Sequence, residues 1–147
     1  MNLREIFKSR WFELALRVGI GALFIYAGAE KLRDPQSFAD SVNSFQMLPA
    51  ALIAPFALAL PIFEIGAGIL IAIGWPRRIG AIALLVLSVM FCIALGQALV
   101  RGLDVNCGCF GPGYSRNPAI ELTGDIVLSA ACAFLYITNL NATGVRK

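Results

Sequence analysis

The chain has 147 residues, of which 59% are hydrophobic and only 14% are charged, and its mean hydropathy is +0.77. Soluble domains usually carry about 25% charged residues. A water-soluble fold of this size cannot bury so many apolar side chains, so lipid must solvate much of the surface. The net charge of +3 is too small and too scattered to indicate nucleic-acid binding. The chain has no histidine, which excludes imidazole from catalysis and from metal or haem ligation.

Four apolar stretches approach the roughly 20 residues that a helix needs to cross about 30 Å of hydrocarbon. They cover residues 11–28, 51–74, 79–100 and 118–140. The sequence therefore predicts an all-α integral membrane four-helix bundle, organised as one domain over residues 1–147. The first stretch has an alternative interpretation as a cleavable signal peptide, because Ala27-Gly28-Ala29 follows a basic start and an apolar run. Arg17 interrupts that run, which favours a spanning helix.

The distribution of Lys and Arg predicts the orientation of the four spans. Seven flank the two termini and the second loop: Arg4, Lys8, Arg10, Arg77, Arg78, Arg146 and Lys147. Four lie in the first and third loops: Lys31, Arg33, Arg101 and Arg116. The richer side is expected to be cytoplasmic. We therefore predict a bacterial inner-membrane protein with both termini in the cytoplasm and the first and third loops outside.

A short amphipathic helix is predicted in the first outer loop. Asp34-Pro35 is a typical helix start, with Asp as the N-cap and Pro at the first helical position. Phe38, Val42 and Phe45 follow at helical spacing, and Pro49 ends the segment. Such a helix either anchors the loop at the membrane interface or lines the mouth of a site.

The third loop contains two cysteines separated by one glycine, Cys107-Gly108-Cys109. The outer compartment is oxidising in bacteria, and a disulfide across one residue is strained and easily reduced. A bridge that closes so short a loop stabilises the fold very little, so a passive structural disulfide is disfavoured. Paired thiolates also suit Cu(I), but no Met-rich tract extends such a site here. Cys107 and Cys109 are therefore predicted to be a catalytic redox pair, and no metal site is assigned.

The other two cysteines, Cys92 and Cys132, lie inside predicted spans. Their depths differ by about 8 Å at the helical rise, which argues against a disulfide between them. Both are expected to be buried free thiols that pack as small apolar residues. Cys92 has the alternative role of a resolving thiol if the loop folds inward.

Three ionisable residues fall within the spans. Glu64 lies near the middle of the second span, where a carboxylate must face the bundle interior and have a partner. Arg17 is a candidate for that ion pair, although its side chain can instead extend to the membrane interface. Asp125 lies about 10 Å into the fourth span. Glu64 and Asp125 are candidate proton carriers, or else structural groups held by hydrogen bonds.

Several motifs resemble those of DoxX-like membrane proteins. They are the run from Gly28 to Pro35 followed by Phe38, then Leu48-Pro49 and Pro61-x-x-Glu64. The run from Asn106 to Gly111, Asn-Cys-Gly-Cys-Phe-Gly, resembles the branch named for the methylamine-utilisation protein MauE. In that branch an acidic residue often precedes the first cysteine, and Asn106 departs from that pattern.

The resemblance implies a four-helix bundle in the bacterial inner membrane that handles redox equivalents or matures exported proteins, often beside a thioredoxin-like partner. The MauE branch is associated with maturation of a disulfide-rich periplasmic amine dehydrogenase subunit.

The leading hypothesis is a membrane thiol–disulfide oxidoreductase in which Cys107 and Cys109 exchange disulfides with a thioredoxin-like periplasmic protein or an exported disulfide-containing client. A lipid-soluble quinone is the candidate electron carrier. Two alternatives remain open. One is a non-enzymatic maturation or assembly factor for a periplasmic enzyme such as methylamine dehydrogenase, and the other is a Cu(I)-binding membrane protein.

Overall fold

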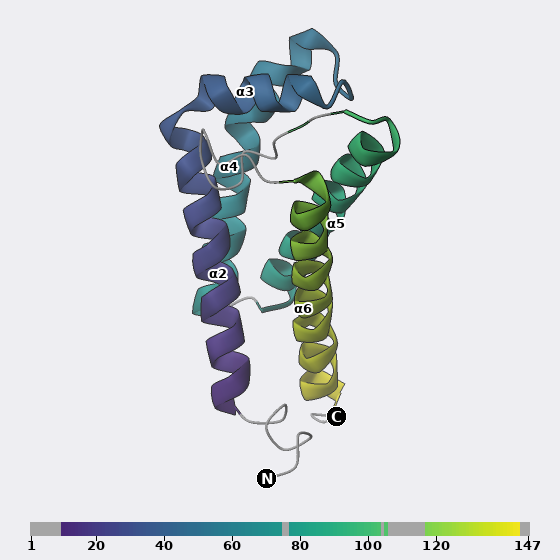
Figure 1. The fold of residues 1–147 in the computed structure, drawn as a ribbon. Helices are drawn as coiled ribbons and strands as arrows, with labels where there is room; N and C mark the ends of the chain where they lie inside the picture. Colours follow the sequence, from purple (N-terminus) through teal and green to yellow (C-terminus); the bar gives the residue numbers. More distant parts are fainter. Residues whose placement is uncertain (1–9, 75–76, 104, 106–116, 145–147) are drawn as a thin grey trace.

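The computed structural model describes residues 10–74, 77–103, 105 and 117–144, and every element in this part of the chain is an α-helix. The helices are α2 (Arg10–Arg33), α3 (Pro35–Ser44), α4 (Ala50–Ile73), α5 (Arg77–Val100) and α6 (Pro118–Gly144). Four long helices run side by side and α3 lies across one end of them (Figure 1). The predicted all-α bundle, with a short helix after its first span, is confirmed.

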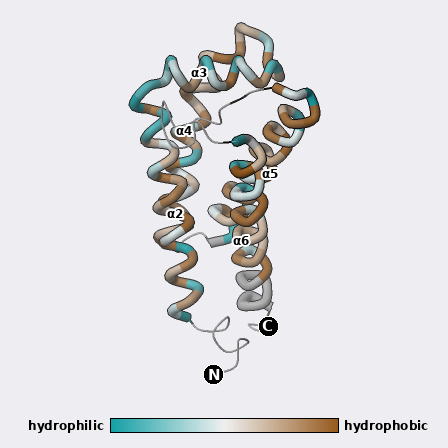
Figure 2. The backbone as a smooth tube through the Cα atoms, in the orientation of Figure 1, coloured by the Kyte–Doolittle hydropathy of each residue, from teal (hydrophilic) through white to brown (hydrophobic). Residues whose placement is uncertain are grey.

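Four helices of the described chain are long and apolar enough to cross a membrane. These segments are Arg10–Arg33, Ala50–Ile73, Arg78–Val100 and Ala119–Ile137. Apolar residues dominate α5, whereas hydrophilic residues gather where α2 meets α3 (Figure 2). Helix α2 begins and α6 ends at the end of the bundle opposite α3 (Figure 1). The first helix continues past the expected boundary at residue 28, so Lys31 belongs to a helix and not to a loop.

Helices α2 and α4 pack closely through small residues. A Cβ atom built on Gly21 would lie 2.7 Å from the carbonyl oxygen of Gly68, and one built on Gly68 would lie 2.8 Å from that of Gly21. Both obstacles are backbone atoms, which cannot move aside as a side chain can. Small residues at such contacts let membrane helices approach each other. The two glycines therefore set the spacing of this helix pair.

Replacing Gly68 with Ala is expected to lower the free energy of unfolding by up to about 2 kcal/mol, because overpacking costs about 1–3 kcal/mol and the gain in helix propensity offsets about 1 kcal/mol. Gly66 is the matched control on the same helix, since a Cβ there meets nothing within 4 Å. Gly66→Ala is expected to be neutral or stabilising. Denaturant unfolding of the purified protein in micelles measures both variants, and equal stabilities would contradict the close-packing argument.

Helix α3 packs against the protein through its apolar face. The Asp34 carboxylate accepts a hydrogen bond from the backbone N–H of Ser37 at 3.0 Å, so the predicted N-cap is confirmed. Phe38 and Val42 are buried and belong to the main hydrophobic core, and α3 packs mainly on α4. The helix ends at Ser44, earlier than expected, and Gln46 then adopts a positive φ of 51°. Of the two roles expected for this helix, covering a site fits its buried face better than anchoring at the interface.

Helices α5 and α6 form the second close pair of the bundle. Their shared interior includes Leu84, Ser88, Cys132 and Leu135, each 0% exposed. At the α3 end, Val105 is buried against Leu95 and Ala98 of α5.

The end of α5 is also tied to the connection between α3 and α4. The Arg101 guanidinium donates to the carbonyl oxygen of Phe45 and to Oε1 of Gln46, each at 3.2 Å. The α3 end of the bundle is therefore held together across three elements.

Candidate functional site beneath helix α3

A buried ion pair joins α2 and α4 close to the α3 end. The Lys31 ammonium donates to both carboxylate oxygens of Glu64 at 2.8 Å, and each side chain is only 1% exposed. Lys31 occupies this position because it continues the buried face of α2, which includes Phe24, Ala27 and Gly28. These residues recur at the three- and four-residue spacing of one helix face. The pair meets the requirement that an intramembrane carboxylate have a partner.

Two aromatic rings cover the ammonium of this pair. The Lys31 Nζ lies 5.4 Å from the centroid of the Phe38 ring and 5.0 Å from that of the Phe91 ring. Both distances lie within the range at which a cation is attracted to a ring face. Phe38 comes from α3 and Phe91 from α5, so four elements meet at one charged group. By packing on α4, helix α3 places the Phe38 ring over the Lys31 ammonium and covers the ion pair at this end of the bundle.

The predicted ion pair between Arg17 and Glu64 is wrong. Arg17 is buried, but its Nε donates to the carbonyl oxygen of Ile71 at 3.1 Å and its Nη2 to that of Ala72 at 3.4 Å. The last carbonyls of a helix lack intrahelical partners and carry partial negative charge. Arg17 therefore caps the end of α4. Glu64 lies seven residues before Ile71 in α4, about 10 Å along the helix, and Lys31 satisfies it instead.

Asp125 is a second intramembrane carboxyl near the pair. Its Oδ2 atom is buried and has no hydrogen-bond partner among the described residues. The charges of Glu121, Lys31 and Glu64 all act on it. The site thus holds two carboxyl groups, Glu64 and Asp125, and one ammonium group. A carboxyl oxygen without a donor can hold a proton, because the protonated carboxyl then becomes a donor itself.

The candidate redox cysteines, Cys107 and Cys109, lie outside the described residues. Cys92 is half-buried with its Sγ 3.6 Å from the Oγ of Ser129, and Cys132 is buried. Both are free thiols, which confirms that no disulfide joins them. The resolving role of Cys92 stays a prediction. Among the residues that the structure describes, no three Cys, Asp or Glu side chains come together as metal ligands.

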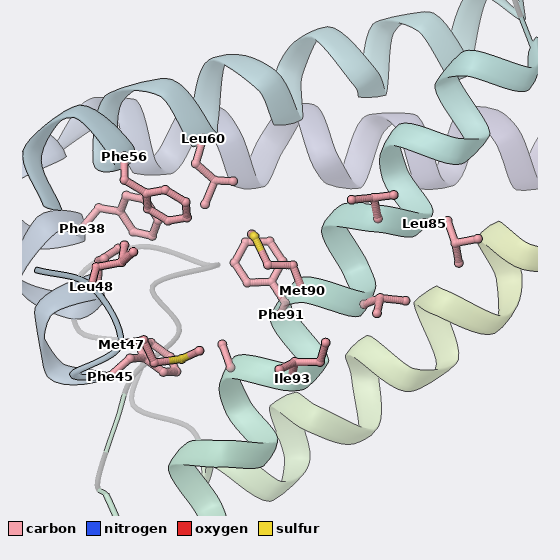
Figure 3. A pocket seen from close by; sticks show the side chains of 14 residues that line it. Phe38, Phe45, Met47, Leu48, Phe56, Leu60, Leu85, Met90, Phe91 and Ile93 are labelled. Atoms are coloured by element: carbon pink, nitrogen blue, oxygen red, sulfur yellow. The ribbon is translucent and has the colours of Figure 1, made fainter. Parts of the chain in front are cut away.

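An apolar pocket of about 640 Å³ lies next to the ion pair, between α5 on one side and α3 and α4 on the other. Side chains that face one another across it (Figure 3) are Phe38, Phe56, Leu60, Met90 and Phe91. Phe38 and Phe91 are shared: they line the pocket and also contact the Lys31 ammonium. The pocket and the ion pair are therefore neighbours in one site, and the Phe38 and Phe91 rings form the wall between them.

Sequence reasoning missed Lys31 and Phe91, whereas it singled out Phe38 on the short helix. Lys31 escapes a hydropathy analysis because charged residues end a hydropathy window. The spacing of the buried face from Arg17 through Phe24 and Gly28 would have placed Lys31 on that face. No comparable signal marks Phe91, since its role depends on how α5 sits against α3.

The sequence of this chain is similar to those of a known protein family. A family model described as "Methylamine utilisation protein MauE" matches residues 9–138. A methylamine utilization protein MauE of Paracoccus denitrificans is 31% identical over 132 residues, which are 87% of this chain and 69% of that protein. A protein of the same name from Methylorubrum extorquens is 33% identical over 113 residues, or 76% of this chain and 61% of its own length.

A third protein of that name, from Methylophilus methylotrophus, is 34% identical over 90 residues, which are 60% of this chain and 47% of the relative. The chain thus spans between about half and about two thirds of the length of these relatives. No solved structure matches the chain. The match of the family model over most of the sequence shows that this membrane protein belongs to the MauE family.

Proposed function

We propose that this protein is a membrane thiol–disulfide oxidoreductase that matures exported proteins, and that it serves methylamine utilisation, as the names of its relatives suggest. Its redox centre is the Cys107–Cys109 pair, and its partner is a thioredoxin-like protein or a disulfide-containing client. Electrons leave the pair through a lipid-soluble quinone. The observation that carries the proposal is the buried Lys31–Glu64 pair with Asp125 beside it, at the end of the bundle from which the Cys-Gly-Cys loop departs.

Val105, which precedes the Cys-Gly-Cys loop, is part of the buried interior at the α3 end of the bundle. Val105, two positions before Cys107, is buried against Leu95 and Ala98, and Phe45 and Phe91 pack against the same cluster. Phe45 and Phe91 also line the pocket. Val105, the last described residue before the two cysteines, therefore packs in a cluster that shares two rings with the pocket. This arrangement supports a shared function for the loop and the intramembrane carboxyls.

Disulfide exchange with a client needs no reactant other than the client's two thiols. A thiolate of the client attacks one sulfur of the Cys107–Cys109 disulfide and forms a mixed disulfide, and the other cysteine leaves as a thiol. The second client thiol then attacks the mixed disulfide. The client gains one disulfide, and the pair is reduced to a dithiol with two electrons and two protons. The same steps in reverse reduce a client disulfide.

The location that suits this chemistry is the bacterial inner membrane, with both termini cytoplasmic and the Cys-Gly-Cys loop on the oxidising side. The count of Lys and Arg supports this orientation. Four basic residues, Lys31, Arg33, Arg101 and Arg116, lie at or near the expected outer loops against seven on the other side.

Replacing both loop cysteines tests the proposal. The Cys107→Ala/Cys109→Ala double variant is expected to lower the rate of client disulfide formation at least tenfold, because no dithiol remains to exchange. The measurement is the free-thiol content of the exported client over time, determined by alkylation. Cys132→Ala is the matched control, since it removes a buried free thiol outside the loop, and it is expected to stay within about twofold of the wild-type rate.

Two outcomes would favour the alternatives. Normal client disulfides in the double variant, with loss of the assembled enzyme, would indicate an assembly factor without redox activity. Stoichiometric copper on the purified, reduced wild-type protein, absent from the double variant, would indicate a Cu(I) site.

A further inference from the structure

The pocket under α3 is accessible from the lipid side of the bundle. Three of its lining residues, Val86, Val89 and Ile93, are 60%, 42% and 55% exposed. They lie on α5, one of the membrane-spanning helices. The exposed part of such a helix faces hydrocarbon and not water. A hydrophobic molecule dissolved in the bilayer can therefore reach the pocket beside α5 without crossing a polar surface.

The walls of the pocket suit a flat ring better than a saturated chain. They include four phenylalanine rings and two methionine sulfurs, from Phe38, Phe45, Phe56, Phe91, Met47 and Met90. Aromatic rings stack face-to-face with an offset or edge-to-face, and thioether sulfur makes favourable contacts with rings. The volume of about 640 Å³ lies within the roughly 300–1,000 Å³ that small-molecule sites usually occupy.

The charged groups behind the wall suit a ligand that exchanges protons. The Lys31 ammonium contacts the Phe38 and Phe91 rings, which also face the pocket. Glu64 and Asp125 lie beyond it, and Asp125 keeps a buried oxygen without a hydrogen-bond partner. The Lys31 ammonium is paired with the Glu64 carboxylate, so the pair adds little net charge next to the pocket and acts there as a group that can exchange a proton. Two carboxyl groups provide places to hold protons near a ligand in the pocket.

We propose that this pocket binds the ring of an isoprenoid quinone, which enters from the bilayer beside α5. The inference rests on the proposed function for its source of electrons. The dithiol of Cys107 and Cys109 gives two electrons and two protons to the quinone, which becomes a hydroquinone while the pair becomes a disulfide. Electrons and protons balance without a further reactant.

Binding of decylubiquinone to the purified protein in lipid nanodiscs tests the proposal by isothermal titration. The wild-type chain is expected to bind one decylubiquinone saturably. Ala94→Trp fills the pocket and is expected to weaken binding at least tenfold. Ala130→Trp makes the same change at an exposed position of α6 outside the pocket, and its affinity is expected to stay within twofold of wild type.

A second pair of variants keeps the test valid if Ala94→Trp does not fold. Val89 lines the pocket and is half-exposed, so Val89→Trp is the pocket variant. Val127 is 65% exposed on α6 and does not line the pocket, so Val127→Trp is its control. The proposal is overturned if the wild type does not bind decylubiquinone saturably. It is also overturned if both pocket variants bind as tightly as their controls, or if a saturated phospholipid competes with equal affinity.

Failure of this inference can be told apart from failure of the proposed function. Binding is measured without thiol chemistry, and the Cys107→Ala/Cys109→Ala protein is expected to bind decylubiquinone as the wild type does. If client disulfides depend on the two cysteines but decylubiquinone does not bind, only the pocket inference fails. If decylubiquinone binds but client disulfides form without the cysteines, only the oxidoreductase proposal fails.

Discussion

Replacing Lys31 with Met is expected to lower the free energy of unfolding by about 3–5 kcal/mol, because it leaves a buried carboxylate without its partner. The Glu64 side chain is 1% exposed and both of its oxygens accept from Lys31. Met preserves most of the length and apolar volume of the lysine side chain, so the change removes the charge with little loss of packing. Unfolding in mixed micelles, followed by loss of helical circular dichroism, measures the effect.

The double variant Lys31→Met/Glu64→Leu separates the charge effect from packing. Removing both partners of a buried ion pair is often neutral or stabilising, so most of the lost stability is expected to return. Arg33→Met is the surface control: Arg33 pairs with Glu30 at 2.8 Å, but its side chain is 76% exposed, and exposed pairs contribute little. If Lys31→Met behaved like Arg33→Met, the Glu64 carboxylate would have to be stabilised by another group.

The main features of the fold were predictable from local sequence patterns. Hydropathy alone located the four spans, and Asp34-Pro35 with Phe38 and Val42 located α3, because capping and periodicity act within a few residues. The partner of Glu64 was not predictable in the same way. Hydropathy shows which residues enter the membrane but not which positions face each other across two helices. The sequence therefore offered Arg17 as the partner and placed Lys31 in a loop, whereas the packing of α2 on α4 brings Lys31 to Glu64.

The pocket illustrates the same limit. Its walls come from α3, α4 and α5, which are separate in the sequence. The sequence alone does not distinguish a phenylalanine that lines a pocket from one that faces lipid. The Cys-Gly-Cys pair is the opposite case, since three consecutive residues are enough to predict redox chemistry. The described structure adds that Val105, two positions before the pair, is buried in a cluster with Leu95 and Ala98.

Asp125 is expected to lower the stability of the bundle while it serves the proposed proton transfer. A buried polar atom without a hydrogen-bond partner costs about 1–3 kcal/mol, and the Asp125 Oδ2 is such an atom in the described part of the chain. Lys31, the nearby cation, already donates to both oxygens of Glu64. A sequence selected for stability alone would place an apolar residue here. An unpaired carboxyl oxygen at this position is what the proposed proton transfer would require.

Replacing Asp125 with Leu is accordingly expected to raise the free energy of unfolding by about 1–3 kcal/mol, because the apolar side chain removes the unpaired oxygen. Asp125→Asn, which keeps the shape but cannot carry a proton, is expected to slow reduction of decylubiquinone by the prereduced protein about a hundredfold, since a positioned acid or base contributes about 10²–10⁴ in rate. Affinity for decylubiquinone is expected to change less than the rate.

The matched control for these variants is Asp40→Asn, an exposed acid on α3, which is expected to change neither stability nor rate. If Asp125→Leu destabilised the bundle while Asp125→Asn kept the full rate, Asp125 would be a structural residue with a partner that forms in the membrane, and Glu64 would be the remaining candidate for the proton. If Asp125→Leu raised the stability and Asp125→Asn lowered the rate, the unpaired oxygen would destabilise the fold and be needed for proton transfer.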